Sequence, residues 1–352
     1  MRQTIKRPGK SGNGNGSHQG KGEKQKFTAP TIPSFQLPRE SRKHYTPYLL
    51  VRDAAGDTGA RPLPGGTVFW ESPDVWVESS LGINQPVVGE PNRVFARVTN
   101  LGWQYATGVT VKFYWADPSL AITETSANLF GMGFADIPSG WSVVVESRKP
   151  WVPVEENGGH ECLIAEAYIP VFDPLTSPMD PVDDRHVGQK NEQLVQVAAG
   201  MAFTTKVKAL NAVGLEQPLT FEVQPLRLAA VHPLVEARAR MLRVALQGPS
   251  PDVLPLSLRM HDDGGVYTGP STLFASRLLE QARQEIAGTS VDTSASVQIA
   301  HTARFAPWES RTVEIRGQVP AGAQPGQTFT FRIVQRIGRM IAGGYTVNVL
   351  VV

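Results

Sequence analysis

Glycine and proline occur so often along this chain that long helices are not expected. The 352 residues include 33 Gly and 28 Pro, and both types favour turns over helix interiors. Between the turns lie short runs in which apolar and polar side chains alternate, which is the period of a half-buried strand. In residues 93–100, for example, Val94, Ala96 and Val98 share one face. The sequence therefore predicts a mainly β fold.

Alternating runs recur along the whole chain. Asn100-Leu-Gly102 supplies a turn, and residues 109–115 predict the return strand of a hairpin. Further strands are predicted at 141–146, 161–169, 193–197, 219–226, 312–315, 328–333 and 345–352. Short strands separated by turns are typical of β-sandwiches, and the length suits two such domains. We expect an arm and strap over 1–64, a first immunoglobulin-like sandwich over 65–200 and a second over 201–352.

Two segments have helical patterns. Residues 271–287 begin at a capping Ser271, end before Gly288 and carry apolar side chains four residues apart, namely Phe274, Leu278, Ala282 and Ile286. This pattern predicts a helix inserted in the second sandwich. Residues 233–246 are read as a helix as well, because Pro233 suits a first turn and Gly248 follows the segment, although part of the run also alternates like a strand.

Several motifs in the first half resemble a known family. They are PDVWVES (73–79), the run from Pro91 to Pro118, IPSGW (137–141), GHECLIAEAYI (159–169) and RHVGQKNEQLVQV (185–197). Together they are similar to the bacterial cell-adhesion-related, immunoglobulin-like domain called CARDB, over roughly residues 68–198. The resemblance implies a β-sandwich that serves as a spacer or binding module, as in exported surface proteins. It specifies a fold more closely than a function.

The N-terminal segment differs sharply in charge from the rest. Residues 1–44 hold ten Lys and Arg against Glu23 and Glu40, whereas the other 308 residues hold 24 basic and 30 acidic side chains. Residues 1–26 have almost no apolar side chains, so we expect them to be disordered alone. This composition predicts an interaction arm, whose basic side chains are Lys6, Arg7, Lys10, Lys21, Lys24 and Lys26. Nucleic-acid phosphates are one target, but the arm has no interleaved aromatic residues for base stacking, so nucleic acid is not favoured. A protein partner, and a solvated tail without any partner, are the alternatives.

Residues 27–64 have the composition of an extended strap. Prolines punctuate the segment, and scattered apolar anchors could lie on a neighbouring subunit; these are Phe27, Ile32, Phe35, Leu37, Tyr45, Tyr48, Leu49 and Leu50. Trp103 and Tyr105 are the other candidate binding residues, because they lie in a turn where burial is hard to arrange. Exposed aromatic side chains there could bind a sugar or a protein.

The strongest candidate for a metal site is an acidic loop. Asp173, Asp180, Asp183 and Asp184 lie within twelve residues, and their carboxylates could hold Ca²⁺. No DxDxDG pattern is present, so a loop in which the aspartates form turns is the favoured alternative.

Catalytic motifs are missing from the sequence. His160, Cys162 and His186 could form a metal site or a Cys-His pair, but a buried Cys162 is favoured. Residues 261–265 are predicted as a turn. The single cysteine allows no intramolecular disulfide. Neither G-x-x-x-x-G-K-[ST], G-x-S-x-G nor H-E-x-x-H occurs. We therefore expect no catalytic residues and no cofactor besides the Ca²⁺ considered above.

Three functional hypotheses follow from these features. The first is a non-enzymatic structural protein whose arm orders on neighbouring subunits or other partners. The second is an adhesion-type module that binds carbohydrate or protein through first-domain loops, and the third, with the least support, is a metal-dependent enzyme. The chain contains neither an apolar run of 18 residues nor an apolar signal region near Met1, so we expect synthesis in the cytoplasm, with incorporation into a larger particle or release left open.

Overall fold

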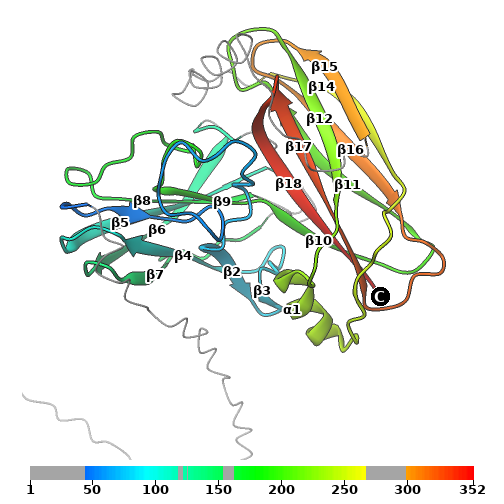
Figure 1. Cartoon of the computed structure of the whole chain (residues 1–352), viewed down its shortest axis with the longest axis horizontal. Helices are drawn as coiled ribbons and strands as arrows, with labels where there is room; N and C mark the ends of the chain where they lie inside the picture. Colours follow the sequence, from blue (N-terminus) through cyan, green and yellow to red (C-terminus); the bar gives the residue numbers. More distant parts are fainter. Residues whose placement is uncertain (1–43, 118–121, 125, 154–161, 267–298) are drawn as a thin grey trace, which may run out of the picture. The chain divides into compact units, whose positions relative to one another are not determined.

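The fold was obtained as a computed structural model that describes residues 44–117, 122–124, 126–153, 162–266 and 299–352. In this part, the chain forms 18 strands and one helix (Figure 1). The prediction of a mainly β protein built from several sheets is therefore confirmed. The basic residues of the arm, His160 and the predicted helix at 271–287 lie outside the described residues.

The first sandwich consists of two sheets. One has the order β1-β4-β2-β3, with β7 also paired to β4; its strands are β1 (Leu49–Leu50), β2 (Val75–Ser79), β3 (Gly82–Ile83), β4 (Arg93–Asn100) and β7 (Ser142–Glu146). The other has the order β6-β5-β8-β9, formed by β5 (Ala106–Ala116), β6 (Ala127–Ile137), β8 (Cys162–Tyr168) and β9 (Val187–Lys190).

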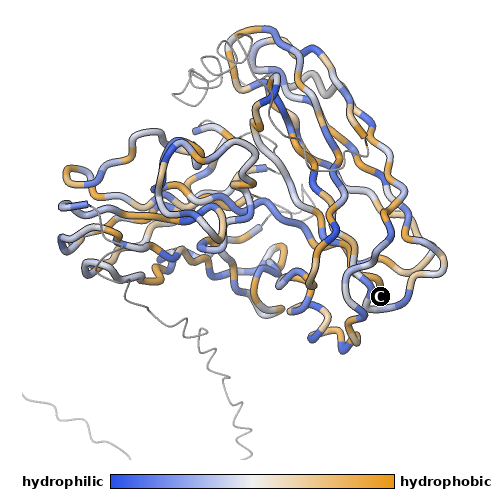
Figure 2. The backbone as a smooth tube through the Cα atoms, in the orientation of Figure 1, coloured by the Kyte–Doolittle hydropathy of each residue, from blue (hydrophilic) through white to orange (hydrophobic). Residues whose placement is uncertain are grey.

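Apolar and polar side chains alternate along the strands, and the apolar ones form the core between these two sheets. Val94, Ala96 and Val98 of β4 are buried in one cluster with Val111 and Phe113 of β5. Each large apolar side chain removed from water contributes about 1.5–3 kcal/mol to folding. The alternating hydropathy is visible along the strands in Figure 2.

The second sandwich pairs a larger sheet with a smaller one. The larger has the order β10-β18-β17-β12-β15, with β13 paired to β17; its strands are β10 (Glu192–Val197), β12 (Gln217–Leu226), β13 (Gly248–Pro249), β15 (Ile299–Phe305), β17 (Gln327–Ile337) and β18 (Met340–Val351). The smaller has the order β11-β16-β14, formed by β11 (Ala202–Leu210), β14 (Leu256–Val266) and β16 (Glu309–Gln318).

Three segments differ from the sequence-based expectations. The strand at 193–197, expected in the first sandwich, pairs in parallel with β18 in the second. The chain changes direction at the fully buried Asn191, whose backbone forms hydrogen bonds with the backbones of Trp70 and Thr346.

Leu49 and Leu50, expected in the strap, pair with β4 as the buried strand β1. Residues 261–265 belong to β14, which accommodates the glycines through an irregularity in register rather than a turn.

The helix predicted from residue 233 is present as α1 (Pro233–Leu242). His232 caps its first turn by accepting a hydrogen bond from the Leu234 backbone N–H at 3.3 Å. The helix ends earlier than expected, since Arg243 has the left-handed φ of 55° that terminates helices. Within the described ranges, no helix combines the length and apolarity needed to cross a membrane.

A buried tryptophan links the segment before β2 to the second sandwich. Trp70 is fully buried, packs with Val334 and donates a hydrogen bond from Nε1 to Thr346 Oγ1 at 3.1 Å. Beside it, Glu71 pairs with Arg332 at 2.9 and 3.0 Å. A side chain on Gly344 would overlap the Trp70 ring, so glycine is needed for this close approach.

Candidate functional site

Four segments meet at one end of the first sandwich. Pairing of Leu49 with Asn100, of Ala106 with Ile137 and of Thr110 with Tyr168 brings the adjoining loops to the same end of the two sheets. We call this the loop end and define it as residues 44–48, 101–105, 138–141 and 169–173. Loops held on a rigid sandwich are common binding sites.

Backbone hydrogen bonds hold the loop end in a fixed shape. Trp103 N–H donates to the His44 carbonyl at 2.7 Å, and Leu101 N–H donates to the Tyr48 carbonyl at 2.8 Å. The buried Asn100 amide donates to the carbonyls of Gln104 at 2.8 Å and Ile137 at 3.1 Å. The turn containing Trp103 is therefore tied to both neighbouring segments.

Large apolar side chains are exposed at this end. The exposed fractions are 86% for Tyr45, 38% for Trp103, 56% for Tyr105, 79% for Val171 and 69% for Phe172. Trp103 and Tyr105 were predicted from the sequence, and the structure places both at the surface. Tyr45 was predicted only as an anchor of the strap. Val171 and Phe172 were missed, although two apolar residues in a short turn between Pro170 and Asp173 are an unusual signal. Single exposed apolar residues are ordinary, whereas several at one end of a sandwich make that end a candidate interaction site.

A polar network fixes the segment that carries Val171 and Phe172. Asp173 accepts a hydrogen bond from the Leu49 backbone N–H at 2.6 Å and forms an ion pair with Arg185. The Arg185 guanidinium lies 3.7 Å from the centre of the Tyr48 ring, which stacks on His44 at 3.5 Å. The 169–173 turn is thereby joined to the segment that precedes β1.

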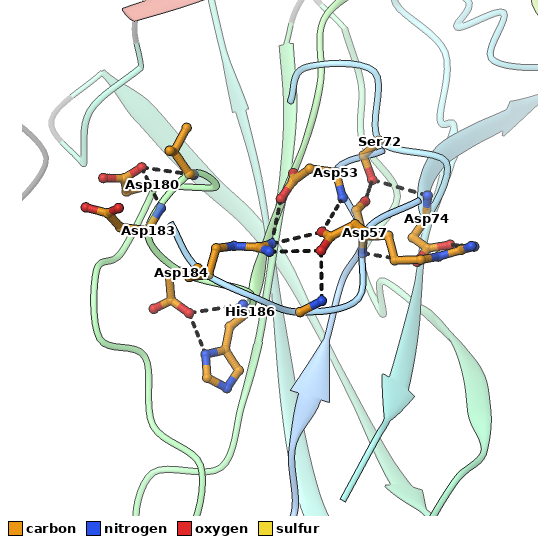
Figure 3. Close-up of polar contacts among 12 residues, drawn as sticks. Asp53, Asp57, Ser72, Asp74, Asp180, Asp183, Asp184 and His186 are labelled. Carbon is orange, nitrogen blue, oxygen red and sulfur yellow. Dashed lines mark hydrogen bonds and ion pairs between the residues drawn. The ribbon is translucent and has the colours of Figure 1, made fainter. Parts of the chain in front are cut away.

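His186 completes this network as a fully buried side chain. Its Nδ1 lies 2.5 Å from Asp184 Oδ1 (Figure 3), and its Nε2 lies 3.2 Å from Asp173 Oδ1. Burial by itself would lower the pKa of His186, but the two carboxylates outweigh it and raise the pKa above 6.5. For Asp184, burial opposes ionisation, yet the contacts with His186 and Ser177 hold its pKa below the ordinary value. The contacts with Asp173 and Asp184 therefore favour the protonated form of His186.

The ion pairs of His186 predict a pH dependence of stability. Because its folded pKa lies above the unfolded value, the stabilisation is complete below pH 6.5 and is lost as pH rises through the folded pKa. Each unit of difference corresponds to about 1.4 kcal/mol. We expect the urea midpoint of the native protein to fall between pH 6 and 9 more steeply than that of His186→Asn, whose amide keeps a donor but does not titrate. Parallel profiles would contradict the assignment.

Three of the four predicted calcium ligands, Asp173, Asp180 and Asp184, accept internal hydrogen bonds through their carboxylates. Asp184 accepts backbone hydrogen bonds from Thr176 at 2.6 Å and Ser177 at 2.9 Å. Asp180 accepts from the backbone N–H groups of Val182 at 3.0 Å and Asp183 at 3.3 Å (Figure 3). Over the described ranges, no three His, Cys, Asp or Glu side chains are grouped to hold a metal ion. The geometry matches a loop shaped by aspartate turns.

Of the Cys-His pairs considered from the sequence, the one between Cys162 and His186 does not form, and His160 lies outside the described residues. Ala167 N–H donates to the His186 carbonyl, which places His186 beside Ala167 in the sheet. Cys162 is buried at the other end of β8, five residues away. Five residues of extended strand correspond to roughly 16 Å. The sulfur and the imidazole are therefore too far apart to react together.

A second buried ionic cluster supports the segment before β2. Arg61 lies 3.0 Å from Asp53 and 2.9 Å from Asp57, the two carboxylates that are labelled in Figure 3. All three side chains are almost entirely buried. Burial, together with the charge of Asp57, raises the pKa of Asp53 well above its ordinary value despite the attraction of Arg61. Perturbed carboxyls can mark catalytic sites, but here the carboxyls surround a guanidinium from the same segment. The cluster holds the chain between Asp53 and Arg61 in place.

Comparisons with known proteins give only distant likenesses. No protein-family model and no curated protein matches the chain. The CupB6 tip adhesin from Pseudomonas aeruginosa aligns over 88% of this chain and 99% of its own at 7% identity, with a TM-score of 0.20. The CFA/I adhesin CfaE from enterotoxigenic E. coli aligns over 90% of both chains at 7% identity, with a TM-score of 0.18.

A similarly weak match involves an enzyme. A family 123 glycoside hydrolase from Clostridium perfringens matches 46% of this chain at 8% identity, with a TM-score of 0.25. That alignment spans 23% of the enzyme's chain. A separate alignment with a red sea bream transglutaminase spans 31% of the transglutaminase chain. Scores this low assign neither a family nor a function, so the resemblance to CARDB stays a prediction.

Proposed function

We propose that this chain is a non-enzymatic structural protein that self-associates through the loop end of its first sandwich. The observation that carries the proposal is the exposure of five large apolar side chains on loops that are already held in shape. Aromatic anchors on a rigid surface are the usual centres of protein interfaces, because little side-chain freedom is lost on binding.

Other features are consistent with a role without catalysis. Each perturbed carboxyl that might act as an acid or base has an internal partner: Asp53 contacts Arg61, Asp184 contacts His186, and Glu166 accepts a hydrogen bond from Tyr114 Oη at 3.0 Å. A hollow between β12, β13 and β17 has a volume of about 10 Å³. That space suits roughly one water molecule.

Self-association can be tested by light scattering on a sizing column. We expect the full-length protein to form a defined oligomer and the Tyr105→Asp/Phe172→Asp variant to dissociate at least tenfold more readily, because two interface anchors are worth about 2–4 kcal/mol. Leu129→Asp is the matched control. Leu129 lies on β6 and is 52% exposed, close to the value for Tyr105, but it lies outside the loop end. A monomeric native protein would refute the proposal, as would equal behaviour of the two variants.

A carbohydrate-binding module is the second candidate. Four of the five exposed side chains are aromatic, and aromatic faces stack on sugars as well as on proteins. Quenching of tryptophan fluorescence by a glycan, lost in Trp103→Ala, would favour this candidate. Oligomerisation that is abolished by changes at the loop end and unaffected by glycans would favour self-association.

A further inference from the structure

The loop end is also where the N-terminal arm joins the described part of the chain. The first described residue is His44, whose carbonyl accepts the hydrogen bond from Trp103 and whose ring stacks on Tyr48. From there, residues 44–50 run from the loop end into the sheet. The 43 preceding residues are therefore attached at the edge of the exposed apolar surface.

The arm has side chains suited to such a surface. Residues 27–37 contain four large apolar side chains in eleven positions, namely Phe27, Ile32, Phe35 and Leu37. Pro30, Pro33 and Pro38 oppose helix formation and favour an extended segment. An extended segment with spaced apolar anchors can occupy a surface that presents exposed aromatic residues.

Charge is complementary between the arm and the first sandwich. Residues 1–44 hold ten Lys and Arg against two acidic residues, whereas residues 45–191 hold nine basic and 18 acidic residues. Residues 192–352 hold 15 basic and 12 acidic residues, so the second sandwich lacks this complementarity. Opposite charge favours encounter of the arm with the first sandwich and disfavours contact between two arms.

We propose that the loop end of one copy receives residues 27–37 from the arm of a second copy. This inference rests on the proposed function and specifies its contact, which joins an arm to a loop end rather than two loop ends. Exchange between copies is favoured over an internal contact by the direction of the chain. Because residues 44–50 run inward, a segment covering its own loop end must reverse direction at the point of attachment.

Mixing two full-length variants tests this contact. The arm variant Phe27→Asp/Ile32→Asp/Phe35→Asp keeps an intact loop end, and the loop variant Tyr105→Asp/Phe172→Asp keeps an intact arm. We expect each to be monomeric alone and their equimolar mixture to form a heterodimer. The dissociation constant of the mixture should lie within tenfold of the value for one native contact. Light scattering with distinguishable tags measures the composition, and unchanged melting temperatures show that both variants are folded.

The possible results separate this inference from the function on which it rests. If the native protein associates but neither variant does and their mixture also stays monomeric, the loop end of the arm variant does not receive the arm of the loop variant, and the inference is overturned. Native-like association of the arm variant alone overturns the inference in the same way. A native protein that is monomeric throughout removes both the inference and the proposed function.

Discussion

Replacing Trp70 with alanine is expected to lower the free energy of unfolding by about 3–5 kcal/mol, the usual cost of truncating a buried aromatic side chain. Trp70 is fully buried against Val334 and Gly344, and it bonds to Thr346. The variant loses these contacts and leaves a cavity, because glycine at position 344 offers no side chain to fill it. Urea denaturation followed by circular dichroism measures the change.

Trp103→Ala is the matched control for this experiment. Trp103 is 38% exposed at the loop end, so its truncation should change the free energy of unfolding by about 1 kcal/mol or less. Similar losses for the two variants would show that Trp70 does not anchor the segment before β2 to the second sandwich. A Trp70→Phe variant should lie between native and alanine, because it restores part of the volume.

Replacing Arg61 with alanine is expected to cost about 3–5 kcal/mol at neutral pH, since it leaves buried carboxyl groups without their cation. The side chains of Asp53 and Asp57 are 0% and 1% exposed, and Arg61 is their shared partner. The loss should be smaller at pH 5 than at pH 8. The pKa of Asp53 is already raised, so its protonation at lower pH removes the uncompensated charge.

Two further variants test whether the loss of stability comes from the burial of this ionic cluster. Arg304→Ala removes a comparable ion pair, 3.1 Å from Glu216, in which both side chains are largely exposed, and it should change stability by 1 kcal/mol or less. Adding Asp53→Asn to Arg61→Ala should recover part of the loss, because a neutral amide replaces the buried carboxyl. If Arg61→Ala and Arg304→Ala are equally mild, the buried cluster contributes little to the fold.

Much of the strand pattern could be predicted because its signal is local. β4 and β5 follow from alternation within a few residues, and the turn between them indicated that Trp103 and Tyr105 are exposed. The same local signal could not assign β10 to a sheet. Its pairing with β18 depends on residues about 150 positions apart, and a strand pattern does not specify its partner.

The candidate site was only partly predictable for a similar reason. Tyr45, Val171 and Phe172 have no common sequence signal with Trp103, and they reach the same end only through the pairing of β1, β5 and β8. The acidic loop suggested calcium because its aspartates are close in sequence. Their actual partners, including Leu49, Arg185 and His186, were not visible in that spacing.

The sequence by itself determined that this chain forms short strands and turns, because side-chain alternation and backbone restrictions act over a few residues. The tertiary structure alone decided which strands share a sheet, which charges are buried together and which apolar side chains are left at the surface. Leu49 bonds to Asp173 across 124 positions and Trp70 to Thr346 across 276. Contacts at such separations depend on how complete sheets pack, and packing is a property of the whole chain rather than of any one segment.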